Sequence, residues 1–340
     1  MRIFDGQGIN MDAKITKQRL SHMLSYDWLK IILTSIGIIL VWSLLFTMTA
    51  TRIQPSQSFG FYAYTGTTVT DKFSLLPNRM EDVFSYEVIE RKTEDINTGG
   101  EEYAIQIMEA RLTTEEVDVL FVANVAGGNI EYTVDGETRQ TTYLEDFLYR
   151  FYSYAYRLDG EYGYLQKMAD YLNSYYQGDY TNPDNIDTNK IESDFRAKIK
   201  ANKDKRYKTE DAIQTAVQGE IDRLQKYRQS LVDFNEYLAK GYIALEESSL
   251  YFSDYDGNQT VLTGCFSINL CPNEETMGEL KKDAYYRVTD EETNETKSAV
   301  KDMNLIIIKD ATENYGFEFE RLSVVTYLVQ TYCSELNPTA

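Results

Sequence analysis

Histidine is almost absent from this chain of 340 residues, since His22 is the only one. A Ser/His/Asp triad, a Cys/His dyad and a histidine zinc site each need at least one histidine beside the reacting group. All three are excluded for the residues after His22. The chain also has no GxGxxG motif, no Walker loop and no GxSxG motif. We therefore expect a protein that is not an enzyme and uses no cofactor.

Catalysis by paired carboxylates is the one alternative that stays open, because Asp and Glu are plentiful. Glycoside hydrolysis, for example, needs only two carboxyl groups at a suitable separation. No particular pair stands out in the sequence, so a carboxylate-dependent hydrolase is a remote alternative.

Cysteine is also scarce, with Cys265, Cys271 and Cys333 as the only three. An odd number permits at most one disulfide and leaves a spare thiol, unlike the even sets of small disulfide-rich scaffolds. No CxxC pair suggests zinc or redox chemistry. The spacing leaves open which two cysteines would pair, if any do.

Positive charge is in short supply, with 34 Lys and Arg against 54 Asp and Glu, a net charge of −20. The residues up to Lys30 carry a net charge of +2, so the rest of the chain carries −22. A field of this sign repels nucleic acid and anionic lipid, and we expect neither as a partner of the acidic region. It can attract cations or basic partners, although an acidic surface more commonly serves solubility.

Only one long apolar run is present, LKIILTSIGIILVWSLLFTMTA from Leu29 to Ala50, with no charge after Lys30. At about 1.5 Å per residue, some 20 residues match a hydrocarbon core of roughly 30 Å. A cleaved signal peptide has an apolar region of only about 7–15 residues and a small-x-small cleavage site. This run is longer and ends TMTATR. We therefore expect a retained transmembrane helix, with the lipid bilayer as the partner of residues 29–50.

The flanking charges predict the orientation of this helix. Five basic residues come before it or lie at its start: Arg2, Lys14, Lys17, Arg19 and Lys30. Arg52 is the only early positive charge beyond it, so the positive-inside rule puts the amino terminus in the cytoplasm. We expect a single-pass protein of the cell membrane with a cytoplasmic tail (1–28), a linker (51–58) and an extracellular remainder. Met11 is an alternative start to Met1.

The first part of the extracellular region alternates strand and helix signals. GFYAYTG (60–66) and SYEVIERK (85–92) are typical of strands, and a helical pattern covers 101–116. VDVLFVAN (117–124) is a continuous apolar run, typical of a strand buried on both faces of a parallel sheet. This order predicts a βαβ unit whose ligand-facing loops follow the carboxyl ends of the strands. Asp135-Gly136 then predicts a hairpin.

A helical segment is expected over 141–244. Thr142 and Glu145 have the spacing of a capping box. Three helices follow from the apolar periodicity, at 142–155, 162–176 and 209–244, with breaks at Asp159-Gly160 and 177–185. The lysine-rich stretch 191–208 has little apolar content and is typical either of a solvated helix or of a linker. Tyrosines crowd this region, which suits ligand recognition or helix packing with polar edges.

The last part returns to mixed structure. Asp256-Gly257 predicts a hairpin, 304–310 an apolar strand and 321–333 a closing helix. We expect residues 59–140 and 245–340 to form one α/β lobe with 141–244 inserted as helices. Asp254, Asp256 and Asn258 have the spacing of a calcium loop, but Gln259 and Cys265 stand where an EF-hand needs Gly and Glu. The hairpin is the better interpretation, and no metal site is expected.

These extracellular segments resemble the type 2 periplasmic-binding fold of the solute-binding proteins of Gram-positive ABC transporters. The resemblance is carried by GFYAYTG and by GGEEYAIQIMEARLTTEEVDVLFVAN, in which a helix leads through an acidic turn into Val117, Asp118 and Val119. GCFSINL and NLIIIKD are similar to the returning half of such a lobe. The chain departs from the family in its helical middle and in using a membrane helix instead of a lipidated cysteine.

The resemblance implies a small-molecule or peptide ligand and a membrane protein partner such as a transporter. Ligand contacts would come from the loops after the first and third strands, at Tyr64, Thr65, Thr67 and Asn124, although such residues are also ordinary in turns. We therefore expect a non-enzymatic binding or sensing domain anchored in the membrane. The alternative is a structural or assembly protein of the bacterial cell envelope that acts through protein contacts.

Overall fold

The computed structural model divides into two compact units, Met1–Arg52 and Ile53–Ala340. It describes residues 16–26, 28–49, 58–66, 83–84, 90–96, 101–134, 137–253, 259–284, 287–289, 296–309 and 318–337. Thr67 and the turn residues 135–136 and 254–258 therefore lie outside the described residues. Among the described residues, the hydrophobic core extends from Phe59 to Cys333, so the second unit folds around a core of its own.

The described residues of the first unit form two helices, α1 (Lys17–Tyr26) and α2 (Trp28–Thr49). The Thr34 and Ser35 hydroxyls of α2 donate to the backbone carbonyls of Lys30 and Ile31, at 2.7 and 2.8 Å. These bonds satisfy polar groups that would be costly to expose to hydrocarbon. The helix predicted over 29–50 is present, and its stretch from Trp28 to Thr47 is long and apolar enough to cross a membrane.

A six-stranded mixed sheet organises the second unit, in the order β2-β1-β3-β10-β7-β6. Its strands are β1 (Ser58–Tyr64), β2 (Glu90–Asp95), β3 (Val119–Ala123), β6 (Ala244–Ser253), β7 (Gln259–Asn269) and β10 (Met303–Ile307). β1 runs parallel to β2 and β3, whereas β10 pairs antiparallel with β3 and with β7, and β6 pairs antiparallel with β7. Strands from both ends of the unit therefore share one sheet.

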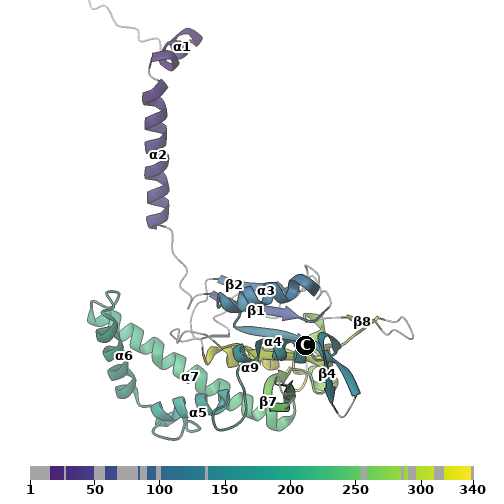
Figure 1. Cartoon of the computed structure of the whole chain (residues 1–340). Coiled ribbons are helices and arrows are strands. Elements are labelled where there is room, and N and C mark those ends of the chain that lie inside the picture. Colours follow the sequence, from purple (N-terminus) through teal and green to yellow (C-terminus); the bar gives the residue numbers. More distant parts are fainter. Residues whose placement is uncertain are drawn as a thin grey trace, which may run out of the picture. The chain divides into compact units, whose positions relative to one another are not determined.

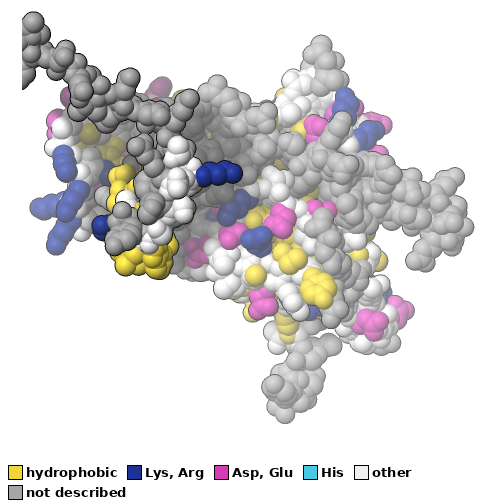
Figure 2. All heavy atoms as spheres, turned by 90° about the horizontal axis from the view of Figure 1, so that it is seen from above, with side chains coloured by type: hydrophobic (Ala, Val, Ile, Leu, Met, Phe, Trp, Pro, Cys, Tyr) yellow, Lys and Arg dark blue, Asp and Glu magenta, His cyan; other side chains and the backbone are white. Residues whose placement is uncertain are grey.

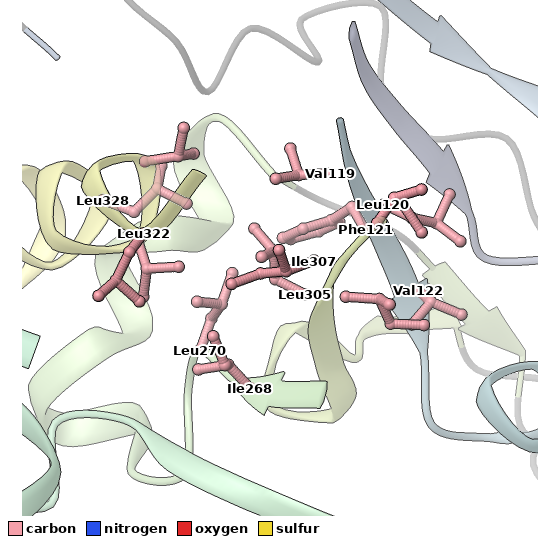
Figure 3. Packing of buried hydrophobic residues seen from close by; sticks show 14 of the residues in the cluster. Val119, Leu120, Phe121, Val122, Ile268, Leu270, Leu305, Ile307, Leu322 and Leu328 are labelled. Atoms are coloured by element: carbon pink, nitrogen blue, oxygen red, sulfur yellow. The ribbon is translucent and has the colours of Figure 1, made fainter. Parts of the chain in front are cut away.

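Helices cover both faces of the central strands. All residues of β3 and β10 are buried, as expected for strands packed on both sides. The helix α3 (Glu101–Thr113) connects β2 to β3 and forms the predicted βαβ unit. In Figure 1, α3 lies above β1, while α4 (Tyr143–Phe151) and α9 (Glu320–Tyr332) lie below it. Leu322 and Leu328 of α9 face the β10 residues Leu305 and Ile307 (Figure 3).

A two-stranded hairpin precedes α4. It consists of β4 (Ala126–Val134) and β5 (Glu137–Thr142), which are antiparallel as predicted. The predicted capping box is also present, because Thr142 Oγ1 accepts from the Glu145 amide at 3.1 Å. In return, Glu145 Oε2 accepts from the Thr142 amide at 2.8 Å. Together these bonds begin α4 directly after β5.

The middle of the chain forms three helices, α5 (Tyr164–Tyr175), α6 (Thr188–Asn202) and α7 (Glu210–Lys240). The carboxyl-terminal half of α7 packs along α9, where the Ser230 and Ser323 hydroxyls lie 2.8 Å apart in the interior. The first half of α7 packs against α6, which carries much of the lysine-rich stretch (Figure 1). That stretch is therefore a helix as far as Asn202 and a turn beyond it.

The remaining elements are short. The strands β8 (Arg287–Thr289) and β9 (Thr296–Ser298) form a two-stranded sheet. The single-turn segments are the helix α8 (Glu274–Met277) and the 3₁₀ segments Tyr152–Tyr154, Pro183–Asn185, Gly278–Lys282 and Val300–Asp302. The three cysteines are all free thiols: Cys271 and Cys333 are buried, and Cys265 is partly exposed.

Candidate functional site

Three of the four predicted site residues meet at one edge of the sheet. Tyr64 ends β1 and Thr65 follows it, while Asn124 follows β3. Because β1 and β3 are adjacent and parallel, with Tyr64 opposite Val122, their carboxyl ends lie side by side. Thr67 lies outside the described residues.

The Tyr64 side chain is occupied by contacts within the protein. Its side chain is only 3% exposed, and its hydroxyl donates to Asp146 Oδ2 of α4 at 3.2 Å. Asp146 is fully buried and also accepts from the Arg150 guanidinium one turn later. Burial, reinforced by the Asp146 carboxylate, raises the pKa of Tyr64 well above its ordinary value. Tyr64 is therefore a neutral donor that ties β1 to α4.

Tyr143, the first residue of α4, packs against this edge. Its ring meets that of Tyr64 edge-on, with centroids 5.6 Å apart. A Cβ atom added at Gly66 would come within 1.8 Å of the Tyr143 ring, and one added at Gly127 within 2.6 Å. Both glycines also have positive φ angles, +70° and +142°, which favour glycine. Thr65 has no exposed surface and Tyr64 is only 3% exposed, so a ligand can touch either side chain only after the residues that cover it move.

Asn124 differs from these two because its side chain is partly exposed. Its amide Nδ2 donates to Glu246 Oε1 of β6 at 3.3 Å, and its backbone N–H donates to the Asp302 carbonyl at 2.7 Å. Asn124 thereby connects the end of β3 to the antiparallel half of the sheet.

An aromatic patch lies on the other side of α4. We use this name for Tyr132, Tyr149, Tyr152, Tyr251 and Phe252, which come from the hairpin, from α4 and the turn after it, and from the edge strand β6. The Tyr132 and Tyr251 rings are parallel to within 7°, with centroids 6.1 Å apart. Phe252 contacts both Tyr149 and Tyr152, at 5.6 and 5.7 Å. Tyr152 is 43% exposed, and the other four are partly exposed.

Hydrogen bonds hold the patch to its neighbours. The Tyr149 hydroxyl accepts from the backbone N–H of Tyr251 at 2.9 Å and so covers part of the free edge of β6. The Tyr132 hydroxyl lies 3.5 Å from Glu145 Oε1, the same carboxylate that caps α4. Burial raises the pKa of Tyr132 and of Tyr149. These side chains are therefore neutral at physiological pH, suited to apolar contact and hydrogen bonding rather than to proton transfer.

Sequence reasoning identified the tyrosines of the helical segment but not this patch. Tyr149 and Tyr152 belong to the tyrosine-rich run, whereas Tyr132 lies in a strand before it and Phe252 in a strand far along the chain. The alternating pattern of β4 and β6 was the only available signal, and it does not say that the two strands meet α4.

A small open pocket lies between the helices of the middle segment. Its lining residues are Tyr171, Tyr175, Ile191, Asp194, Phe195, Lys198, Glu220 and Leu224. Aromatic and acidic walls of this kind suit a cation. The chain supplies one itself, since Lys190 Nζ lies 2.7 Å from Asp194 Oδ2 and 4.6 Å from the centroid of the Tyr175 ring.

Among the described residues, no three His, Cys, Asp or Glu side chains are grouped so that they could hold a metal ion. The stretch Asp254–Asn258 with calcium-loop spacing lies outside that part of the chain. A scan against protein-family models finds no matching family, and comparisons with curated proteins and with solved structures find no similar chain.

Proposed function

We propose that this is a single-pass membrane protein that holds a non-enzymatic recognition domain, residues 53–340, on the extracellular side. The support for the anchor is α2, whose apolar stretch spans a bilayer in length and carries no charge after Lys30. The basic residues before it favour a cytoplasmic amino terminus. The separate core of the second unit fits a domain attached to this helix by a short linker.

The aromatic patch is the observation that carries the recognition function. Tyrosine and phenylalanine are enriched in protein interfaces, where they contribute large contact areas and, for tyrosine, a hydrogen-bonding group. Here the aromatic rings come from three separate parts of the chain, and Tyr152 and Phe252 present apolar surface to solvent. The proposed occupant is another protein of the membrane or cell envelope, such as a transporter.

Photocrosslinking in intact cells tests this proposal. The photoreactive residue p-benzoylphenylalanine is introduced at Tyr152 in the full-length chain, with Tyr162 as the matched control because it is 82% exposed and lies outside the patch. The proposal expects one discrete adduct from position 152 and none from position 162. Equal labelling from both positions would mean that the patch has no special partner.

The identity of the captured protein separates the two functional alternatives. A transporter subunit supports an accessory binding or sensing role, whereas a cell-wall or division protein supports an envelope assembly role. Protease treatment of intact cells tests the orientation, because an extracellular domain is digested and a cytoplasmic one is spared.

A small-molecule or peptide ligand at Tyr64, Thr65, Thr67 and Asn124 is a second candidate, implied by the resemblance to solute-binding proteins. Asn124 favours it, because its partly exposed amide sits at the carboxyl edge of the parallel strands. Thermal-shift screening of residues 53–340 against sugars, amino acids and peptides is the test, since a ligand that binds only the folded state raises the melting temperature. Tyr143→Ala should enlarge any shift caused by a ligand at Tyr64, because this substitution removes the ring that packs edge-on against Tyr64.

A further inference from the structure

One end of the helical segment is strongly basic, although the whole protein is acidic. We call residues 196–208, the end of α6 and the turn into α7, the basic tip. It contains seven Lys or Arg and one Asp, a net charge of +6, so the rest of the chain carries −26. Figure 2 shows Lys and Arg side chains gathered at the left end of the molecule, where Figure 1 places α6. Positive charge is therefore concentrated at this end of the helical segment.

The arginines of the basic tip are already paired. Arg196 binds Glu192 and Glu210, and Arg206 binds Asp204. The five lysines of the tip make no ion pair with any described residue, and all five are exposed: Lys198, Lys200, Lys203, Lys205 and Lys208. The internal carboxylates thus fix the arginines, whereas the lysine ammonium groups, of which only that of Lys198 lies near a carboxylate of a described residue, Asp194, are exposed to meet an external anion.

The backbone holds the tip in a definite shape. The Phe195 and Tyr207 rings contact each other across the turn, with centroids 5.3 Å apart. Lys203 ends α6 in the left-handed conformation, with φ of 50° and ψ of 41°. Glycine is the residue that adopts this conformation most easily, so a lysine here is held at some conformational cost. Lys203→Gly therefore removes one charge while keeping, or improving, the local fold.

We propose that the basic tip binds the anionic phospholipid headgroups of the bilayer that α2 spans. The choice of lysine favours a lipid surface over a protein, because protein interfaces are depleted in lysine and enriched in arginine. Flexible ammonium groups suit a fluid array of phosphates, to which each added lysine contributes. The same lipid surface repels the strong negative charge of the rest of the chain. This repulsion orients the basic tip toward the lipid surface.

The short linker between α2 and β1 also favours the bilayer as the partner of the basic tip. Eight residues separate Thr49 at the end of α2 from Ser58 at the start of β1, and the nine steps from Thr49 to Ser58, at about 3.5 Å each, reach at most roughly 30 Å. The domain therefore stays beside the bilayer and meets its headgroups at high effective concentration. This step rests on the proposed membrane anchor. Vesicle binding by the detached domain is measured without the helix, so the two proposals fail separately.

Cosedimentation of residues 53–340 with vesicles tests the proposal, since this unit has its own core. The vesicles contain either phosphatidylcholine alone or phosphatidylcholine with 30% phosphatidylglycerol. We expect binding only to the anionic vesicles, weakened by raising the salt concentration. Replacing the five tip lysines by Gln should weaken it roughly tenfold or more, and Lys203→Gly alone should weaken it measurably while the melting temperature is kept or raised.

A charge-matched variant is the control. It replaces five exposed lysines elsewhere by Gln: Lys167, Lys240, Lys281, Lys282 and Lys301. This variant should bind the anionic vesicles like the unmodified domain. Equal loss in both variants, or no binding to anionic vesicles at all, overturns the proposal. Tip-dependent binding to DNA or self-association without vesicle binding also overturns it, because the partner would then be a nucleic acid or a second copy of this chain.

Discussion

Arg321 and Asp118, which are 203 residues apart in the chain, form an ion pair in the interior, with Nη2 and Oδ1 separated by 2.9 Å. Arg321 is fully buried and also donates to the Ile308 carbonyl. Asp118 Oδ2 accepts from the Gly60 amide at 2.7 Å. This one pair therefore joins α9 to β1, to the start of β3 and to the residue after β10.

Breaking this ion pair should lower the stability of residues 53–340. Asp118→Ala leaves the Arg321 charge buried without its partner, and we expect a loss of about 3–5 kcal/mol in the free energy of unfolding of residues 53–340. Urea denaturation followed by circular dichroism measures it. The exposed Arg139–Glu137 pair is the control, and Glu137→Ala should cost less than about 1 kcal/mol. A loss of similar size at both sites would mean that the buried pair adds little.

Glu320 should make the stability depend on pH in the direction opposite to most carboxylates. It lies in α9 and is only 2% exposed. Burial raises its pKa from 4.5 to about 7, against the opposing effect of the Arg223 guanidinium. The folded state thus prefers the neutral acid. The contribution of neutral Glu320 to the free energy of unfolding is complete below about pH 4.5 and is lost as the pH rises through about 7.

Glu320→Gln tests this dependence, because the amide stays neutral at every pH. We expect the variant to be more stable than the wild type at pH 8 by roughly 2–3 kcal/mol, with the difference shrinking toward pH 5. Denaturation curves between pH 5 and 8 are the measurement. Glu161→Gln, at an exposed position, should leave the wild-type profile unchanged. A pH-independent difference for Glu320→Gln would contradict the raised pKa.

The two glycines under Tyr143 should not tolerate a side chain. Gly66→Ala places a Cβ 1.8 Å from the Tyr143 ring at a φ of +70°, so we expect a loss of more than about 2 kcal/mol. Gly219→Ala is the matched control, because nothing lies within 4 Å of a Cβ at that position in α7. That substitution should stabilise the domain by about 0.5–1 kcal/mol. Thermal and urea unfolding of the two variants should therefore shift in opposite directions.

A charge in the middle of α2 should prevent membrane insertion. Leu40→Arg costs about 3 kcal/mol at the centre of a spanning helix, whereas Thr47→Arg near its end costs less. Carbonate extraction of membranes from cells that produce the full chain is the measurement. Leu40→Arg should move the protein to the extractable fraction, and Thr47→Arg should leave it in the membrane. Retention of Leu40→Arg would argue that another element holds the protein there.

Local signals predicted most of the elements. The capping box at Thr142 and Glu145 and the buried run of β3 depend on neighbours within a few residues, so their patterns are visible in the sequence. The lysine-rich stretch was ambiguous, because α6 buries only Ile191 fully and its packing against α7 comes from tertiary contact. The short hairpin of β8 and β9 was not predicted at all, since three-residue strands carry too little pattern.

The candidate site was predictable only in outline. The topology of parallel strands explains why Tyr64 and Asn124 meet at one edge. The cover of Tyr143 over Gly66 and Gly127 depends on the path of the hairpin between β3 and α4, which no local rule predicts. The distribution of charge was also predictable only in outline. The net charge of −20 indicates repulsion from anionic surfaces, yet the basic tip carries a net charge of +6 at one end of the helical segment.

The sequence by itself determined the apolar helix of α2, the near absence of histidine and the positions of most helices and strands, because these follow from composition and from periodicity over a few residues. Only the tertiary structure decided that β10 lies between β3 and β7, that Arg321 meets Asp118, and that hairpin, α4 and β6 share one aromatic patch. Such contacts join residues from about 35 to about 200 positions apart, and packing of the whole core selects among the many pairings that local patterns allow.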